Sequence, residues 1–291
     1  MILEKLIVKN EDGKQIIFSV NSDYHVNIKK DVRGLSDATN EIYTQRGLGQ
    51  YGATVTGYQL KSRIIEIQGS FKPIDKNTVS FLRQNLNNVL SPEETLEVTY
   101  DLSGNQRKIS GITQEIKFDS GNIYYDFYIS ILCPDPLWRD PMETATSIVS
   151  WEGAFEFPVE ITSDWEIGRL NKQAEVNVIN RGDVTCGCRI VFYATASLTN
   201  PSLKNTETED YIKLKVSLSK GDKLEVTTHY RNKTAYITRA NGEKENAIQY
   251  LDPSSTFLQL EIGDNLFSYN ADSGKSNLEI TIYHDNLYRG V

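Results

Sequence analysis

The sequence predicts a mainly β protein of two domains, with one amphipathic helix in the first. Three observations support this prediction. Many short stretches alternate apolar and polar residues, as a strand with one wet face requires. Gly and Asn separate the later stretches at roughly 8–15-residue intervals, the rhythm of a β-sandwich. A length of 291 residues suits two ordinary domains.

The first domain is predicted to span residues 1–135. "KLIVKNEDGKQIIFSV" predicts two strands joined at Asp12-Gly13, a dipeptide that tolerates positive φ and favours a hairpin. Further strand patterns follow in "SRIIEIQGSFK", "TLEVTYDLSG", "NQRKISGITQEIKFD" and "NIYYDFYISIL". This order indicates an antiparallel sheet with one wet face.

One helix is predicted near residues 76–91. Its apolar residues recur at three- and four-residue spacings and form one stripe: Val79, Leu82, Leu86, Val89 and Leu90. Asn77 or Asp75 is expected to cap the start, and Pro92 to close the end.

A proline-rich strap, "CPDPLWRDP", stands near the midpoint of the chain. Proline fixes φ and lacks a backbone N–H, so the strap is neither helix nor central strand. It predicts a stiff linker over 136–150 in which Trp138 fixes one domain on the other. The interdomain strap residues are Pro134, Pro136, Leu137, Trp138 and Pro141.

The second domain is predicted to span residues 151–291 and to be a β-sandwich. Its strand patterns are "AEVNVIN", "CRIVFYATASL", "YIKLKVSL", "DKLEVTTHY", "KTAYITRANG", "TFLQLEIGDNLFSYN" and "SNLEITIYH". No comparable helix accompanies them.

Charge and cysteine content exclude several classes of protein. The formal net charge is −8, with 16 basic and 18 acidic residues in 1–140 and 15 and 21 in 141–291, so no basic surface is offered to nucleic acid. Three cysteines are too few for a disulfide framework, and no apolar run reaches membrane-spanning length. The start has no signal-peptide pattern, which indicates synthesis and folding in a reducing cytoplasm.

No motif predicts a cofactor, a metal or catalysis. "GLGQYG" at 47–52 matches G-x-G-x-x-G, but β-branched residues rather than a helix follow it, so a flexible loop between strands is the better interpretation. "CGC" at 186–188 is interpreted as small buried strand residues, since His229 and His284 are each isolated in sequence. His25 stands apart from any nucleophile motif. Acidic pairs such as Glu93 and Glu94 are interpreted as solvated charge. The chain is therefore predicted not to be an enzyme.

Segments along the whole chain resemble the distal tail protein (Dit) family of siphophages. "LSDATNEIYTQRGLGQYGATVTGYQLKSRIIEIQGSF" is similar to its first-domain segment, with Gly52, Ala53, Gly57 and Arg63 at the family's G-[AS]-x-x-x-G and arginine positions. The strap resembles the family's most specific mark, with Leu137 where Phe is usual. "VINRGDVTCGCRIVFYA" and "KGDKLEVTTHYRNKTAYI" are similar to its later strand entries. The last residues resemble its closing Tyr-x-Gly-Val: Tyr288, Gly290 and Val291.

The resemblance implies structural work in a virion tail. It implies a split-barrel-like first domain that forms a homo-hexameric ring, and a second domain that is a galectin-like, jelly-roll β-sandwich and lies at the periphery. The implied partners are the tail tube protein, the tail-tip hub and a receptor-binding or baseplate protein, with assembly in the host cytoplasm. A loop contacting the next subunit or ring is predicted from these residues: Arg46, Gly47, Gly49, Gly52, Gly57 and Arg63. The alternative is a module that binds host cell-wall glycan, for which Trp138, Trp151, Trp165 and many tyrosines could stack on sugar rings.

Overall fold

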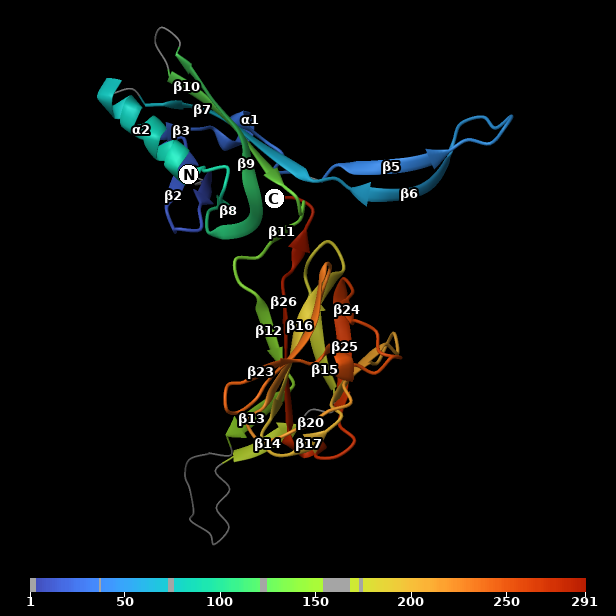
Figure 1. The fold of residues 1–291 in the computed structure, drawn as a ribbon. Helices are drawn as coiled ribbons and strands as arrows, with labels where there is room; N and C mark the ends of the chain where they lie inside the picture. Colours follow the sequence, from blue (N-terminus) through green and yellow to red (C-terminus); the bar gives the residue numbers. More distant parts are fainter. Residues whose placement is uncertain (1–3, 37, 73–75, 121–124, 154–167, 173–174) are drawn as a thin grey trace. The chain divides into compact units, whose positions relative to one another are not determined.

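The computed structural model describes residues 4–36, 38–72, 76–120, 125–153, 168–172 and 175–291. By its internal contacts the chain divides into two compact units (Figure 1). The first unit is Met1–Pro141 together with Leu287–Val291, and the second is Met142–Asn286. Strands dominate both units, so the predicted mainly β fold is confirmed.

The first unit contains most of its strands before residue 134 and one at the end of the chain. They are β1 (Glu4–Lys9), β2 (Gln15–Ser19), β3 (Tyr24–His25), β4 (Val32–Arg33), β5 (Asn40–Gln45), β6 (Thr54–Leu60), β7 (Arg63–Phe71), β8 (Leu96–Leu102), β9 (Asn105–Ser120), β10 (Tyr125–Cys133), β11 (Trp138–Arg139) and β27 (Leu287–Tyr288). The Asp12-Gly13 prediction is confirmed: Gly13 has φ 84°, and β1 and β2 pair antiparallel on either side of it.

A closed path of hydrogen-bonded strands makes the first unit barrel-like. Its sheet runs in the order β10-β7-β3-β2-β1-β8-β9-β11-β27, and β10 also pairs with β9. The long strand β9 closes the path because residues 105–111 pair with β8 and residues 112–120 pair with β10. This arrangement agrees with the split-barrel expectation.

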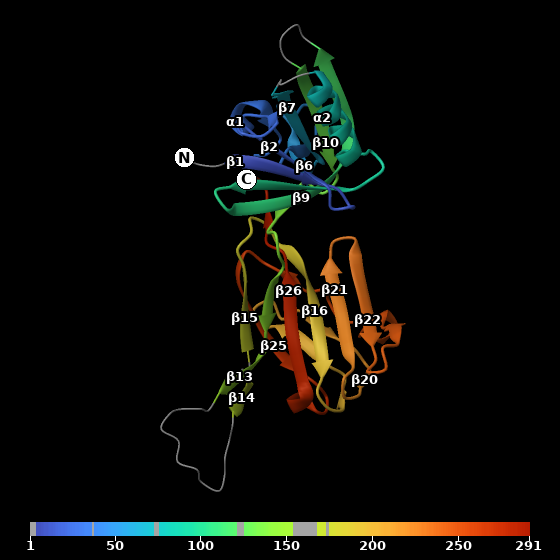
Figure 2. The same cartoon turned by 90° about the vertical axis from the view of Figure 1, so that its left-hand side faces the viewer.

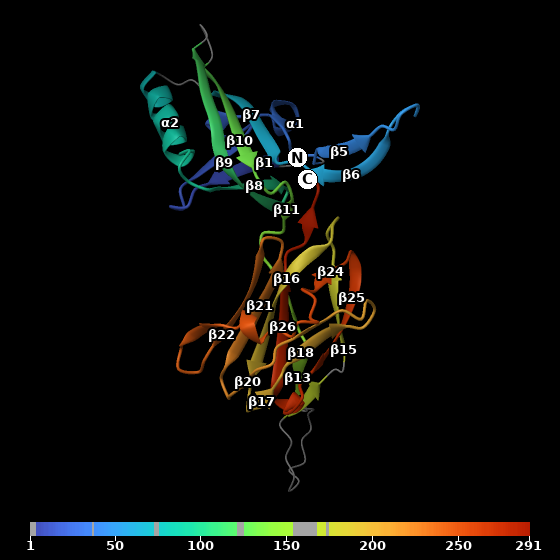
Figure 3. The ribbon, with the colours of Figure 1, turned by 45° about the vertical axis from the view of Figure 1, so that its right-hand side comes forward.

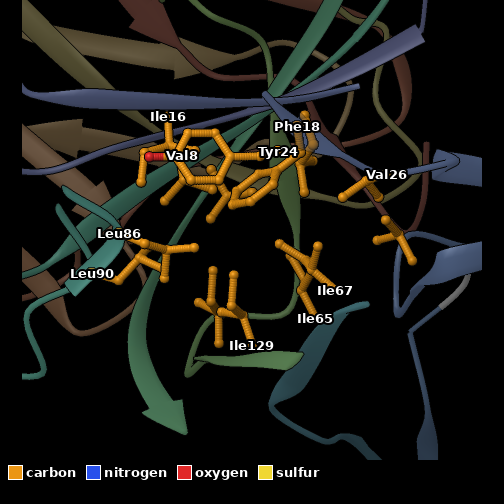
Figure 4. Close-up of a cluster of buried hydrophobic side chains, with 14 of the residues drawn as sticks. Val8, Ile16, Phe18, Tyr24, Val26, Ile65, Ile67, Leu86, Leu90 and Ile129 are labelled. Carbon is orange, nitrogen blue, oxygen red and sulfur yellow. The ribbon is translucent and has the colours of Figure 1, made fainter. Parts of the chain in front are cut away.

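Helix α2 (Lys76–Val89) lies beside the strands of the barrel (Figure 2) and packs its apolar stripe onto their core (Figure 4). All five predicted stripe residues are buried, and the Tyr24 hydroxyl donates to the Leu82 carbonyl at 3.3 Å. Asn77 lies inside the helix rather than at its cap, and Asp75 lies outside the described residues. A short second helix, α1 (Ile28–Asp31), buries Ile28 in the same core.

The second unit is a β-sandwich (Figure 3). Its strands are β12 (Thr144–Ser147), β13 (Val149–Gly153), β14 (Gly168–Lys172), β15 (Glu175–Asn180), β16 (Cys186–Ala194), β17 (Leu198–Thr199), β18 (Ser202–Asn205), β19 (Tyr211–Lys213), β20 (Ser217–Leu218), β21 (Lys223–His229), β22 (Asn232–Thr238), β23 (Lys244–Asn246), β24 (Gln259–Leu260), β25 (Gly263–Asn270) and β26 (Leu278–His284), with 3-10 turns η1 (Ile248–Tyr250) and η2 (Lys275–Asn277). The larger sheet has the order β12-β26-β16-β21-β22-β23 with β24 beside β16, and the smaller has the order β15-β25-β18-β19. Strands such as β15, β18 and β26 alternate buried and less buried residues, which places one face of each sheet in the core.

The division between the units differs from the predicted boundaries. Residues 136–141 of the expected linker belong to the first unit, and 142–150 belong to the second. The last five residues, expected in the second domain, return to the first unit. The reason is strand pairing, because β27 pairs antiparallel with β11 and β11 also pairs with β9.

Candidate functional site

Strands β5 and β6 form a long hairpin that we call the arm, residues Asn40–Leu60 (Figure 1). Among the described residues, the two strands pair only with each other. Their register shifts at Tyr43/Thr44, which marks a β-bulge. A two-stranded hairpin is marginally stable by itself in water. We therefore expect that a surface covering the arm would stabilise it.

The arm exposes an unusual number of apolar side chains. Ile42 and Tyr58 are cross-strand partners, so they share a face, and the Tyr58 side chain is 77% exposed. Val55 is also exposed, and Leu48 and Tyr51 at the tip are fully exposed. Clustered exposed apolar groups mark interaction sites on soluble proteins.

The glycine-containing loop at the tip of the arm lies where the sequence predicted a loop between strands. No helix follows it, so the pyrophosphate-binding arrangement of G-x-G-x-x-G is missing from this described stretch. The Gln50 side chain accepts a hydrogen bond from Gly47 N at 3.0 Å and donates to Thr54 Oγ1 at 2.9 Å. Arg46, Gly47, Gly49 and Gly52 are all exposed.

Arg63 does not share the environment of this loop, although the sequence grouped it there. It is the first residue of β7 and is only 5% exposed. Its Nε donates to the Pro136 carbonyl at 2.8 Å and its Nη1 to the Gly34 carbonyl at 2.6 Å. The guanidinium also donates to the carbonyls of Ser36 and Arg289. Arg63 thus joins three separate segments of the first unit, and its buried side chain offers little surface to another subunit.

The C-terminal segment Leu287–Val291 lies in a site formed by Arg63, Arg107, strand β11 and the loop 34–36, which we call the C-terminal docking site. Trp138 in β11 pairs with Tyr288 in β27. The guanidinium of Arg107 lies 3.6 Å from the Tyr288 ring centroid and donates to the Gly290 carbonyl. Val291 N donates to the Leu35 carbonyl at 3.1 Å.

Two features hold the docking site in shape. Trp138 is completely buried within the core of the first unit, 5.9 Å from the Arg63 guanidinium. Gly34 has φ 83°, and a Cβ there would lie 2.0 Å from the Ile64 carbonyl oxygen. Only glycine therefore lets the 34–36 loop approach β7 closely enough to place its carbonyls on Arg63.

The strap was predicted to be a linker between the domains, but its residues differ in burial. Pro134 and Pro141 are exposed, Pro136 and Leu137 are half-buried, and only Trp138 enters a core. That core belongs to the first unit. Trp138 is therefore a structural residue of the docking site, whereas it was expected to fix one domain on the other.

The second unit carries an open groove of about 670 Å³ on the outer face of its smaller sheet. Lys204 and Tyr211 are cross-strand partners there, as are Ser202 and Lys213. Lys213 forms an ion pair of 2.7 Å with Asp272, a residue that does not line the groove. The groove thus presents fixed donors and acceptors beside a half-buried tyrosine. Trp165 lies outside the described residues, and the Trp151 side chain is not described.

The cysteine pair and the histidines form no metal centre within the described residues. Strand pairing sets Cys188 opposite His284, and both are buried. Burial raises the pKa of Cys186 to about 12 and that of Cys188 to about 11, so both stay protonated. Between them, Gly187 allows the backbone of His229 to approach, since a Cβ would lie 2.5 Å from its Cα. These positions agree with small buried strand residues. His25 contacts the Val20 carbonyl through Nδ1 at 2.8 Å.

Comparison with known proteins identifies the family of the chain. A family model described as a phage tail protein RIFT-related domain matches residues 11–133. A second, described as a siphovirus-type tail component, C-terminal domain, matches residues 181–288. The chain belongs to the siphophage distal tail protein family. Its members are structural components of phage tails. A search of curated proteins found no match.

Solved structures of distal tail proteins and baseplates share the fold at low sequence identity. The crystal structure of the Dit protein of phage SPP1 aligns with a TM-score of 0.70 and 15% identity, covering 97% of this chain and 98% of that one. A chain of the phage P2 baseplate in its activated conformation with Ca aligns with a TM-score of 0.52 and 11% identity, over 97% and 98% of the two chains. The same baseplate with Sr gives 0.54 and 11%, with the same coverage.

Several residues of this distal tail protein's docking site had no signal in the sequence. Arg107 lies in an ordinary alternating strand pattern, and Leu35 and Gly34 stand in a short polar stretch. The Tyr-x-Gly-Val ending was the one available sign that the last residues matter.

Among the described residues, no helix is long and apolar enough to cross a membrane.

Proposed function

We propose that this chain forms a homo-hexameric hub ring at the distal end of the tail of a long-tailed phage or a phage-tail-like particle. The ring would join the tail tube to the tail-tip hub and to a baseplate or receptor-binding protein. The family supports a tail role, and the Dit protein of SPP1 is described as a paradigm of the hub adsorption apparatus in phages that infect Gram-positive bacteria. Assembly would take place in the host cytoplasm.

The observation that carries the ring proposal is the arm. Its exposed apolar residues lie on a hairpin that pairs with no other strand in the described chain. In a ring every subunit meets an identical neighbour, so one arm contact repeated by rotation closes the assembly. We assign the arm, including Arg46, Gly47, Gly49, Gly52 and Gly57, to contact with the next subunit.

Substitution on the arm tests this assignment. We expect the purified wild-type chain to form rings with a central hole in negative-stain images and a hexamer mass by light scattering. The double variant Ile42→Ser with Tyr58→Ser should raise the concentration for half-assembly at least about 10-fold, since removing about 1.4 kcal/mol of burial is sufficient. Phe81→Ser is the matched control, because that side chain is 68% exposed on helix α2.

Two results would contradict the proposal. One is equal weakening of the ring by the arm and control variants. The other is a chain that stays monomeric at high concentration even when mixed with its tube protein. In addition, hydrogen exchange of Arg46–Gly57 should slow in the ring relative to the monomer. Equal exchange in both states would remove the arm from the interface.

The role is structural rather than catalytic. No motif of the sequence combines a nucleophile, a base and metal ligands, and no cofactor is required for the proposed work. The support is the family itself, whose matched domains are tail components.

A second candidate function, attachment to host cell-wall glycan, is favoured by the groove on the second unit. Vicinal sugar hydroxyls both donate and accept hydrogen bonds, and the groove sets lysines near the carboxylates of Glu175 and Asp252 beside Tyr211. Titration with cell-wall polysaccharide tests it. Tyr211→Ala should abolish binding, whereas Tyr230→Ala, outside the groove, should not. Rings that bind no polysaccharide would reject this function and leave the hub role intact.

A further inference from the structure

The last five residues of the chain belong to the unit that is synthesised first. Leu287–Val291 is part of the first unit, yet the whole second unit, Met142–Asn286, separates it from Pro141. In most multidomain proteins the N-terminal domain folds as a unit while the rest is still being made. Here the first unit cannot acquire all its parts until the second unit has been synthesised.

These residues add the last strand to the sheet of the first unit. Strand β27 occupies one edge of β11, whose other neighbour is β9. Tyr288 and Val291 pack against the hydrophobic core of the first unit. Arg63 and Arg107 donate to consecutive carbonyls, those of Arg289 and Gly290. The site therefore recognises an extended peptide by main-chain contacts, as sheet-edge binding sites do.

A chain lacking this segment would have an incomplete first unit. Arg63 is buried, and removal of the Arg289 carbonyl takes away one of the acceptors of its guanidinium. The edge of β11 beside the buried Trp138 would lose its paired strand. Both changes should destabilise β11 and the start of β7, whose first residue is Arg63.

We propose that Leu287–Val291 is a completion segment: it docks into the first unit after the second unit has been synthesised, and it makes the first unit competent to assemble only in chains that contain it. At 5 to 20 residues per second, synthesis of residues 142–291 takes about 8 to 30 s, during which the docking site is empty. Truncated chains with a damaged second unit would be kept out of the assembly. This last consequence rests on the proposed ring, whereas docking itself does not.

The test compares the full-length chain with a chain lacking residues 287–291. Hydrogen exchange followed by mass spectrometry should show at least about 10-fold faster exchange at β11 and at the start of β7 in the truncated chain. Strands β16 and β21 of the second unit provide the internal reference and should exchange equally in both chains. Mass photometry should show that the truncated chain does not enter rings formed by the full-length chain.

A synthetic peptide provides the matched rescue. The peptide Asp285–Val291, added to the truncated chain, should restore slow exchange at β11, and a scrambled peptide of the same composition should not. If truncation also speeds exchange in the second unit, the full-length Tyr288→Ala variant decides. Faster exchange at β11 with an unchanged second unit supports the proposal, and unchanged exchange at β11 opposes it.

Equal exchange at β11 in the truncated and full-length chains would overturn the proposal, as would rescue by the scrambled peptide. Free entry of truncated chains into rings would overturn the assembly part. If the full-length chain forms no ring at all, the proposed hub function fails, and the exchange and peptide measurements still decide whether the segment docks.

Discussion

Two parts of the C-terminal docking site, the 34–36 loop and Arg63, flank the arm in sequence, yet the docking site and the arm differ in almost every physical respect. The arm ends at Leu60, and Arg63 begins β7 three residues later. The arm exposes Ile42 and Tyr58 and pairs with no other described strand, whereas the docking site buries a guanidinium among backbone carbonyls. One sequence segment therefore serves two purposes, contact with other molecules and integrity of its own unit.

The largest expected effect comes from comparing the two arginines of this segment. Arg63→Leu removes the shared donor of four carbonyls in a buried site, and we expect it to lower the free energy of unfolding by about 3–5 kcal/mol. Arg46→Leu, at the exposed tip of the arm, should change it by less than about 0.5 kcal/mol. Urea unfolding measures both, and similar losses in the two variants would erase the proposed difference.

A smaller effect is expected from a carboxylate site in the second unit, whose contribution to stability depends on pH. Burial opposes ionisation of Asp222, but hydrogen bonds from Ser219 N, the Arg239 guanidinium and Ala240 N outweigh it, so the pKa of Asp222 is lowered from 3.8. Its contribution to stability is therefore complete above about pH 4 and is lost as the pH falls through the lower folded pKa.

Asp222→Asn should reduce stability by about 1–3 kcal/mol at pH 7 and flatten its decline below pH 4. The four carbonyls that accept from Arg63 do not titrate, so their part of the loss caused by Arg63→Leu should be the same at pH 7 and pH 4.5. Thermal unfolding across this pH range measures both variants. A loss for Arg63→Leu that shrinks with acid would show that a carboxylate contributes to the docking site.

The smallest effect is that of one hydroxyl group in each region. Tyr288→Phe removes a long hydrogen bond to Asp140, 3.4 Å, and keeps the ring on Arg107, so we expect a loss of about 0.5–1 kcal/mol. Tyr58→Phe, on the exposed face of the arm, should have no measurable effect on the isolated chain. Matched urea curves test the pair, and a larger loss at Tyr58 would mean that the arm is held by its own unit.

Local patterns in the sequence predicted the local structure well. The three- and four-residue spacing of Val79, Leu82 and Leu86 placed α2 on the core, and Asp12-Gly13 placed the first hairpin. Both features depend on residues close together in the chain, where periodicity and turn preference act directly.

The docking site could not be predicted in the same way. It depends on pairing between Trp138 and Tyr288, residues so far apart that no local spacing connects them. The resemblance marked Arg63, the strap and the Tyr-x-Gly-Val ending separately, without indicating that they meet. A proline strap that precedes a second domain favours a linker in sequence terms, and only the pairing of β11 on both edges shows that it ends inside a folded unit.

The pairing of β11 with β27 also makes the second unit an insertion in the topology of the first. The chain leaves after Pro141 and re-enters at Leu287, and these points flank two strands in direct register. Paired positions of neighbouring strands lie only about 4.5–5.5 Å apart. Any domain whose own termini come that close could be grafted between the same two points, so the scaffold is suited to exchanging its second unit while the first stays unchanged.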